Sequence, residues 1–287
     1  MGKKRSREAD GKTADPVVDD VDKMDEDSGE DFDNIDVDFE WFNFDPEIDF
    51  HGVKALLRQL FDVDANQFNM SELADLVLAQ NTIGSTVKTD GKGTDAYAML
   101  TALNTFVHRE KAPMQDILKY LVEKANTNEA LASTVTPLLT GDHHVGLVFS
   151  ERFINMPAEI APPLFSMLID EVEAAVEDNE PYNFSHYLIL SKTYQEVEST
   201  LDVEERKRKK AKEESSMFYF HPEDEVLQKY AVAHGGFAYT REDDSVADSK
   251  RAFQEMGIKA QGHMILIEAS KFPAAIKAVT EYINPPL

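Results

Sequence analysis

The sequence predicts a mixed α/β fold in which one sheet is flanked by helices. Apolar residues at helical spacing alternate along the chain with short runs of β-branched and aromatic residues. Hydrophobic residues make up 42% of the 287 residues, a share close to that of ordinary folded domains. This pattern begins near residue 45 and contains no internal repeat. We therefore expect one globular domain at 45–287.

The N-terminal half of this domain is predicted to combine helices with one β-hairpin. Over 49–61 apolar residues recur at helical spacing, so that Val53, Leu56 and Leu60 share one face. The turn residues Asp90-Gly91 separate two apolar runs, which is the pattern of a hairpin. We expect helices at 49–61, from the N-cap Ser71, from Pro113, and from Asn128 to about Pro137, and strands at 82–91 and 96–107.

The C-terminal half is predicted to alternate strands with helices. Pro162-Pro163 lies inside a long helical pattern and indicates either a kink or a later helix start. Residues 202–216, rich in Lys, Arg and Glu, are expected to form a charged loop. We expect strands at 145–149, 184–197, 217–220, 236–240 and 261–268, helices at 158–176, 222–232 and 273–283, and a loop at 151–157.

Acidic residues are concentrated near the N-terminus. Residues 13–50 hold sixteen acids and one base, a net charge of −15, whereas 51–287 carry −13 and 1–12 carry +3, for a total of −25. Because residues 1–34 contain few apolar groups, we expect 1–44 to be a disordered acidic tail that begins with a basic cluster. Such a tail either promotes solubility or imitates nucleic acid and occupies a basic partner.

The composition also limits the classes of function. A net charge of −25 disfavours direct binding to nucleic acid or to an anionic membrane, since both need a positive surface. The chain has no cysteine, which excludes disulfides, thiolate catalysis and zinc-finger sites. The first residues are charged and lack the apolar region of a secretory signal, so we expect an intracellular protein.

Acidic and aromatic residues are interleaved where the tail meets the domain. One interpretation is a docking motif for a partner protein, and the other is the first strand of the domain. The alternation of Ile35, Val37 and Phe39 suits a strand or an extended peptide. Under the docking interpretation the candidate partner-binding residues are Asp31, Asp33, Asp36, Asp38, Phe39, Glu40, Trp41 and Phe42.

No arrangement of residues in the sequence indicates catalysis. Lys92 lies in a Gly-Lys-Gly-Thr segment that lacks the spacing of a phosphate-binding loop and reads as a hairpin turn. His143 and His144 would point to opposite faces of a strand, which disfavours a shared metal ion. No G-x-S-x-G nucleophile motif is present. We expect no catalytic, cofactor-binding or metal-binding residues, and hence no enzymatic activity.

Two short basic clusters interrupt the acidic sequence. Such clusters are typical of nuclear-import signals, although the second one can also be a solvated loop that pairs with neighbouring acids. The candidate import residues are Lys3, Lys4 and Arg5 in the first cluster and Arg206, Lys207, Arg208, Lys209 and Lys210 in the second. We therefore expect a nuclear protein that shuttles to the cytoplasm.

Three segments, at 37–61, 86–100 and 147–172, carry a resemblance to a known family. Its most specific part combines Ser150-Glu151-Arg152, Ile154-Asn155-Met156-Pro157 and Pro162-Pro163-Leu164, and a Tyr-Phe-His-Pro-Glu-Asp-Glu segment follows at 219–225. In these motifs, their order and the acidic tail, the chain resembles the BCCIP family from about residue 35 to the C-terminus.

The resemblance implies a fold like that of the GNAT acetyltransferases without their activity. Acetyltransferases of that type follow their central strand with a glycine-containing turn whose N–H groups hold the cofactor pyrophosphate. Here the strand at 145–149 is followed by a segment without glycine that contains prolines, which lack N–H groups. We therefore expect that acetyl-CoA binding in the usual mode is lost and that no cofactor is bound.

The resemblance also implies a function as a nuclear escort. Fungal members of the family are linked to chaperoning a basic large-subunit ribosomal protein of the universal L-fourteen type, and to nuclear export of a lipid kinase. Partners would then be that ribosomal protein, nuclear transport receptors and the lipid kinase, with a role in ribosome biogenesis. The alternatives are a scaffold for DNA-repair or cell-cycle regulators, as animal relatives suggest, and a divergent acetyltransferase.

The second basic cluster leads to a test of import. Replacing Lys207, Arg208 and Lys209 with Ala should shift a fluorescent fusion of the full chain from the nucleus towards the cytoplasm, because an import receptor reads the positive charges. The same substitution at Lys3, Lys4 and Arg5 compares the two clusters. Unchanged localisation of both variants would contradict the assignment of import to these clusters.

Overall fold

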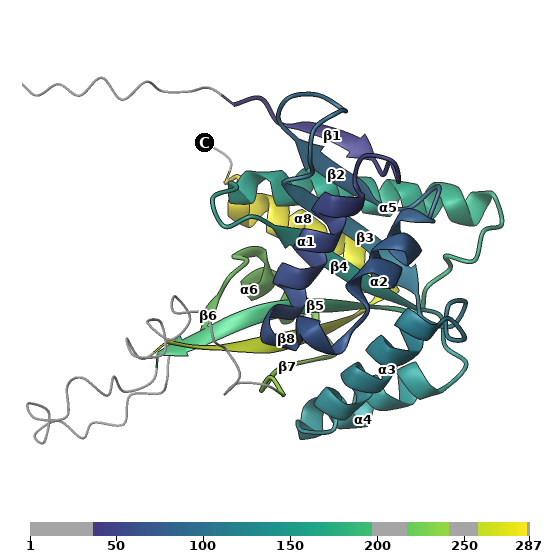
Figure 1. The fold of residues 1–287 in the computed structure, drawn as a ribbon. Coiled ribbons are helices and arrows are strands. Elements are labelled where there is room, and N and C mark those ends of the chain that lie inside the picture. The colour runs from purple at the N-terminus through teal and green to yellow at the C-terminus, as the bar shows by residue number, and fades with distance from the viewer. Residues whose placement is uncertain (1–36, 197–216, 241–257, 286–287) are drawn as a thin grey trace, which may run out of the picture. The chain divides into compact units, whose positions relative to one another are not determined.

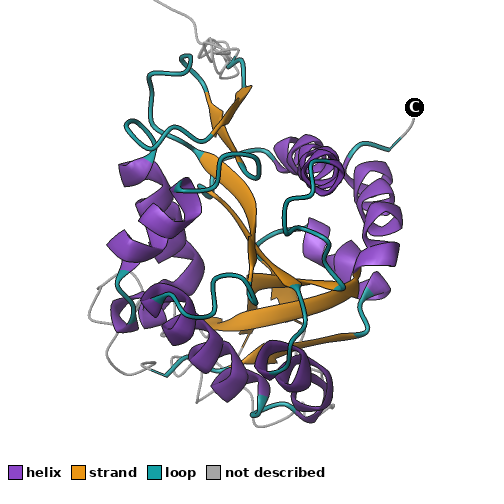
Figure 2. Ribbon diagram, turned by 90° about the vertical axis from the view of Figure 1, so that its right-hand side faces the viewer, coloured by secondary structure: helices purple, strands orange, loops and turns teal. Residues whose placement is uncertain are grey.

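A single mixed sheet with helices on both faces organises the domain (Figure 1 and Figure 2). The computed structural model describes residues 37–196, 217–240 and 258–285, and the structural statements that follow concern these ranges. Within them the predicted mixed α/β fold is confirmed. These ranges contain eight strands and seven α-helices.

The sheet has the strand order β1-β2-β3-β4-β5-β8-β7, with β6 also paired to β5. Within the described ranges β4 and β5 are the parallel pair, and the other paired strands are antiparallel. The strands are β1 (Glu40–Asn43), β2 (Ser85–Lys88), β3 (Ala98–Asn104), β4 (Val145–Arg152), β5 (His186–Glu196), β6 (Met217–Tyr219), β7 (Ala233–Phe237) and β8 (Ile258–Glu268). A parallel pair needs a crossover, and helix α5 (Ala161–Glu177) provides it.

Two layers of helices cover the sheet and create two hydrophobic clusters. On one face lie α1 (Phe50–Phe61), α2 (Met70–Leu78), α3 (Ala112–Ala125) and α4 (Glu129–Thr140). On the other lie α5, α6 (Glu223–Leu227) and α8 (Phe272–Ile283). Figure 2 shows helices on both sides of the sheet. Because both faces are covered, β2, β3 and β4 are buried along their whole length instead of alternating.

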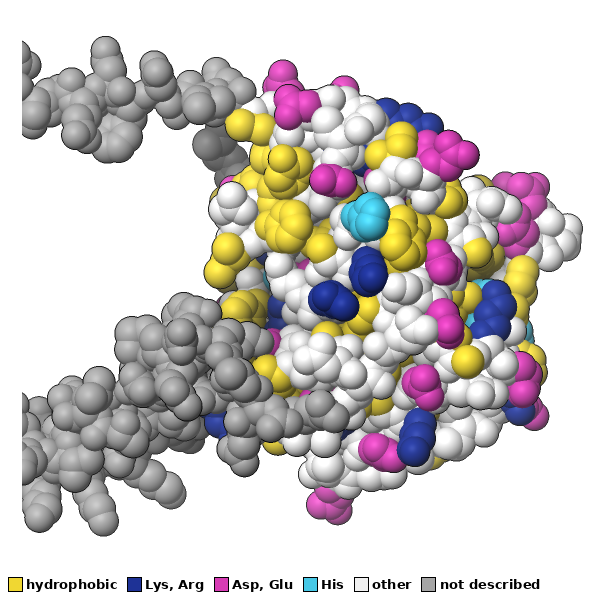
Figure 3. Space-filling view, viewed as in Figure 1, with side chains coloured by type: hydrophobic (Ala, Val, Ile, Leu, Met, Phe, Trp, Pro, Cys, Tyr) yellow, Lys and Arg dark blue, Asp and Glu magenta, His cyan; other side chains and the backbone are white. Residues whose placement is uncertain are grey.

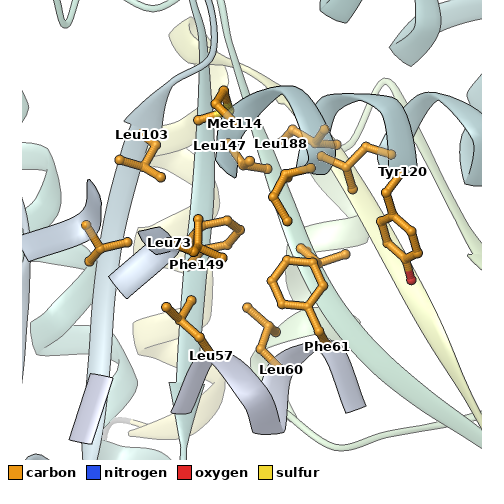
Figure 4. Packing of buried hydrophobic residues seen from close by; sticks show 14 of the residues in the cluster. Leu57, Leu60, Phe61, Leu73, Leu103, Met114, Tyr120, Leu147, Phe149 and Leu188 are labelled. Atoms are coloured by element: carbon orange, nitrogen blue, oxygen red, sulfur yellow. The ribbon is translucent and has the colours of Figure 1, made fainter. Parts of the chain in front are cut away.

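Aromatic side chains fill the centre of the first layer (Figure 4). Phe149 of β4 lies with its ring 5.9 Å from that of Phe61 at the end of α1, and Phe61 lies 6.1 Å from Tyr120 of α3. Both phenylalanines are at most 1% exposed. Burial of each such side chain stabilises the fold by ~1.5–3 kcal/mol. This packing fixes the C-terminal end of α1 against the middle of β4.

Several predicted elements are confirmed. β2 and β3 form the expected antiparallel hairpin, and its turn places Gly91 at a φ of 81°, which glycine adopts without strain. Pro113 lies in the first turn of α3. Asn128 caps α4 by accepting a hydrogen bond from the Ala130 N–H at 3.1 Å.

Other boundaries are corrected by the structure. The first strand lies at 40–43 rather than over 35–39, β7 lies at 233–237 rather than 236–240, α6 ends at 227 rather than 232, and α4 continues past Pro137 to Thr140. The cap of α2 is Asn69 rather than Ser71, because the Asn69 side chain accepts the Glu72 N–H at 3.4 Å. Since β1 belongs to the sheet, the domain begins at residue 37 and not at 45.

A buried ion pair links β2 to the start of α1. Lys88 Nζ lies 2.6 Å from Asp49 Oδ1, and both side chains are fully buried. Lys88 also donates a hydrogen bond to the Lys92 carbonyl at 2.7 Å in the hairpin turn. This lysine therefore holds the helix, the strand and the turn together.

Replacing Lys88 with Met should lower the free energy of unfolding by ~3–5 kcal/mol, because Asp49 would remain buried without its partner. Urea unfolding of the purified full chain measures this loss. The control is Lys92→Met, which breaks an exposed pair with Asp45 and should change stability little. Equal effects of the two substitutions would contradict the role given to Lys88.

Candidate functional site

The strands β4 and β5 separate part-way along the sheet. Their pairing covers 145–149 and 186–190, and beyond it 150–152 pair with β3 while 193–195 pair with β6. The β4–β5 ladder therefore ends at Phe149 and Leu190, and the residues that follow in the two strands are not paired with each other. This separation opens a gap in the middle of the sheet.

A pocket of about 600 Å³ opens at this gap. Its charged lining includes Glu151, Lys192 and His221, and its apolar lining includes Phe153, Ile154 and Phe220. Ile154 is 91% exposed, so an apolar side chain lies open to solvent at the pocket. The pocket combines apolar walls with convergent polar groups, as ligand sites do, and is therefore the candidate functional site.

Charged residues fill the gap on the side of α1. Glu151 Oε2 lies 2.7 Å from Lys192 Nζ, and Glu151 Oε1 lies 3.1 Å from His221 Nε2. Gln59 of α1 donates from Nε2 to Glu151 Oε1 at 2.9 Å and to the Arg152 carbonyl at 2.7 Å. Lys192 in turn donates to the Gln59 carbonyl at 2.9 Å. One carboxylate thus contacts α1, β5 and His221, which lies two residues before α6.

A second set of contacts joins the gap to α6 on the other face. The Arg152 guanidinium makes a bidentate pair with the Glu223 carboxylate. The Ser191 hydroxyl of β5 donates a hydrogen bond to the Asp224 carboxylate. All four side chains are buried or nearly so. Together with Glu151, Lys192 and His221, they form one network of charged and polar groups, here called the gap network.

The protonation of the gap network follows from its contacts. Burial opposes ionisation of Glu151, but the hydrogen bond from His221 and the charges of His221 and Lys192 outweigh it and lower the pKa of Glu151 to about 2. Burial likewise opposes the charge on His221, but the hydrogen bond to Glu151 prevails and raises the pKa of His221. Burial raises the pKa of Asp224 to about 7. Glu151 and His221 therefore favour each other's charged forms.

The gap network is suited to holding elements together rather than to reacting. Glu151 and Glu223 are committed to Lys192, His221 or Arg152, and the buried Asp224 accepts a hydrogen bond from Ser191, so each carboxylate already has a partner within the network. The described ranges contain no group of three His, Cys, Asp or Glu residues that could hold a metal ion. We interpret the network as a structural joint.

The connection from β4 to α5 supports this interpretation. Residues 153–160 contain no glycine, and Pro162 and Pro163 occupy the start of α5. Prolines supply no N–H group, so the first turn of α5 offers few donors to a phosphate. The residues present therefore do not fit the pyrophosphate of acetyl-CoA in the mode used by acetyltransferases.

The described part of the aromatic–acidic segment lies in and next to β1. Asp38 and Glu40 are exposed, whereas Phe39, Trp41 and Phe42 are half-buried. Phe39 and Trp41 pack against the cluster around α5 and α8, and Lys88 Nζ lies 5.8 Å from the centre of the Phe42 ring. The interpretation as a first strand is thus confirmed for 40–43. Residues outside the described ranges are Asp31, Asp33, Asp36, Lys3, Lys4, Arg5, Arg206, Lys207, Arg208, Lys209 and Lys210.

The gap network was not predicted from the sequence. Glu151 was placed in a loop at 151–157, yet β4 continues to Arg152 and buries both residues. The available signal was the Ser-Glu-Arg motif directly after an apolar strand, together with the His-Pro-Glu-Asp motif at 221–224. Among 54 acidic residues neither motif stands out without the structure.

Comparison with known proteins establishes the family. The model of the BCCIP family matches residues 34–227, a region that contains the sheet from β1 to β6 and the whole gap network. This chain belongs to the BCCIP family. The expected resemblance is therefore confirmed, and the BCCIP motifs at 150–157 coincide with the end of β4 and the lining of the pocket.

Relatives of this BCCIP-family chain come from several fungi. It is 71% identical to Protein BCP1 of Gibberella zeae over 286 residues, covering 99% of each chain. It is 40% identical to Protein bcp1 of Schizosaccharomyces pombe over 259 residues, covering 88% of this chain and 91% of the relative. The crystal structure of BCP1 from Saccharomyces cerevisiae superposes with a TM-score of 0.61 at 27% identity, covering 90% and 93%. None of these names denotes an enzyme.

His221 leads to a test of the gap network. Its pKa is higher in the folded protein than in the unfolded chain, so its stabilisation is complete below its ordinary pKa of 6.5 and is lost as pH rises through the raised pKa. Replacing His221 with Gln should therefore lower the free energy of unfolding by ~1–3 kcal/mol at acidic pH. The difference from the unsubstituted chain should shrink as pH rises.

Urea unfolding at several pH values from about 5 to 9 measures this difference, because histidine ordinarily titrates within this range. The control is His143→Gln, since His143 is an exposed histidine on the same domain. A difference for His221→Gln that grows with pH would contradict the assigned charge on His221.

Proposed function

We propose that this chain is a non-enzymatic nuclear chaperone and transport adaptor for a basic large-subunit ribosomal protein of the universal L-fourteen type. The observation that carries the proposal is the charge of −15 over residues 13–50, against one base in that segment. A ribosomal protein that has not yet bound RNA exposes many Lys and Arg side chains. A concentrated acidic segment is their natural counter-surface.

The gap network supports this proposal, because its charged groups in the described residues are paired with one another. The buried charges at the gap between β4 and β5 are committed to one another, and the first turn of α5 does not suit a phosphate. The domain can therefore serve as a rigid body that recognises shape. Membership in the BCCIP family, whose fungal relatives named above carry no enzyme name, is consistent with this role.

The proposed mechanism divides the work between the tail and the domain. The acidic segment covers the RNA-binding Lys and Arg side chains of the client and prevents aggregation and early contact with RNA. The domain supplies selectivity, and the basic clusters recruit nuclear transport receptors, so the complex shuttles between nucleus and cytoplasm. A lipid kinase exported from the nucleus is a second proposed cargo, and ribosome biogenesis is the process served.

The tail mechanism is tested with the full chain. Replacing Asp31, Asp33, Asp36 and Asp38 with Asn should weaken binding of the basic client and make it less sensitive to salt. The reason is that exposed charges are screened beyond ~8 Å at physiological ionic strength, so the salt dependence reports how many charges take part. Calorimetric titration of the purified ribosomal protein at low and high salt measures both quantities.

The control keeps the same net charge but changes its position. Four exposed acids on helices, Asp116, Glu123, Glu173 and Glu177, are replaced with the corresponding amides. This variant should retain most of the affinity and of the salt dependence. Equal losses in the two variants would show that bulk charge rather than the tail matters, and failure of the unsubstituted chain to bind would refute the proposed function.

A further inference from the structure

β1 forms one edge of the sheet, and its outer side has no partner strand in the described part of the chain. Its ladder is with β2 alone, over residues 40–43 and 85–88. Figure 1 shows β1 at the top of the domain, at the end of the sheet. The strand at the other end, β7, differs because it packs against α4. An open edge exposes N–H and C=O groups that another strand can pair with.

The register shows which backbone groups point outward. The Val87 carbonyl accepts the Tyr97 N–H at 2.8 Å, so Val87 faces the hairpin partner rather than β1. Backbone directions alternate along a strand, hence Thr86 and Lys88 face β1. Their partners are Phe42 and Glu40.

The residues between these partners therefore direct their backbone groups away from the sheet. They are Trp41 and Asn43, and together they offer two N–H donors and two C=O acceptors on the outer edge. The contact from the Thr86 hydroxyl to the Phe42 carbonyl at 3.3 Å agrees with this assignment, since it places that carbonyl on the β2 side.

Side chains along this edge combine negative charge with apolar surface. Asp38 and Glu40 are exposed, and Val37 is 47% exposed. Trp41 is half-buried beside them. Figure 3 shows acidic and hydrophobic side chains next to one another over β1 and β2. In sequence three further acids, at 31, 33 and 36, come directly before this edge.

We propose that the outer edge of β1 receives an extended basic segment of the client as an additional strand. The inference rests on the proposed function and adds the place and mode of binding. Hydrogen bonds to Trp41 and Asn43 would supply sequence-independent affinity. Lys or Arg side chains of the added strand would lie across from Glu40 and Asp38, where opposite charges on neighbouring strands stabilise the pair.

The charge on the edge selects this occupant over a second copy of the chain. Two β1 strands placed edge to edge would bring together two edges that both carry the exposed acids Asp38 and Glu40 and that both follow a strongly acidic sequence. Like charges in that position are destabilising, and natural proteins use them to keep strand edges from pairing with themselves. A basic strand meets the same acids with the opposite sign.

The decisive variant is Asn43→Pro. It removes one outward N–H but keeps the ladder with β2, because the Asn43 N–H does not take part in that ladder. Proline is tolerated on edge strands in this position. The matched control is Asn43→Ala, which keeps the N–H and removes only the exposed amide side chain.

The probe is a short synthetic peptide that alternates Lys with Thr, titrated into the full chain. Asn43→Pro should weaken binding of the peptide about tenfold, because the variant loses one backbone hydrogen bond to it. Asn43→Ala should bind the peptide as tightly as the unsubstituted chain does. In NMR spectra of the unsubstituted chain, the amide signals of Trp41 and Asn43 should shift on titration. This second measurement stands even if Asn43→Pro does not fold.

Either of two results with the peptide would overturn the inference, and so would a third result, with the ribosomal protein. One is equal binding of the peptide by Asn43→Pro and Asn43→Ala. The other is a set of amide shifts centred on the pocket around Glu151 and His221 instead of β1. If the intact ribosomal protein binds the unsubstituted chain and Asn43→Pro equally well, the edge mode fails and the proposed function stands. If the ribosomal protein does not bind at all, the proposed function fails while the peptide titration still decides the edge.

Discussion

The separation of β4 from β5 is the constraint on which the rest of the structure depends. Once the ladder ends at Phe149 and Leu190, the backbone and side chains beyond it need other partners, because unpaired polar groups are costly inside a protein. The gap network provides them through Glu151, Lys192 and His221. Since these contacts reach α1 on one face and α6 on the other, the two helix layers are fixed relative to each other through the sheet.

A gap filled by mutually neutralised charges also determines where function can lie. Buried ion pairs add little net stability, because desolvation offsets their attraction, but they enforce one geometry. Our interpretation of the gap network as a structural joint assigns the centre of this fold to structure, although pockets at such positions often carry catalysis. Under the proposed function, recognition falls to the charge of the acidic sequence and to the open edge of β1.

Particular residues show how far sequence reasoning reached. Pro113, the Asp90-Gly91 turn and the helix start at Asn128 depend on local sequence, so these features are predicted and confirmed. Glu151 and Arg152 were assigned to a loop, because charged residues are seldom fully buried without partners. Their partners His221 and Glu223 lie 70 and 71 positions further along the chain, a separation that no local pattern encodes.

The amino-acid sequence by itself determined the fold class, the uneven distribution of charge, the absence of cysteine chemistry and the family motifs, because each of these depends on residue type and short-range spacing. Tertiary structure alone decided that Glu151 is buried, that the domain begins with β1, and that Trp41 and Asn43 direct their backbone groups outward. The physical reason is that burial and strand pairing are set by segments that meet only in the folded chain. The backbone N–H and C=O groups of β1 alternate in direction, but which of them point towards a partner strand and which point outward is set only when β1 pairs with β2.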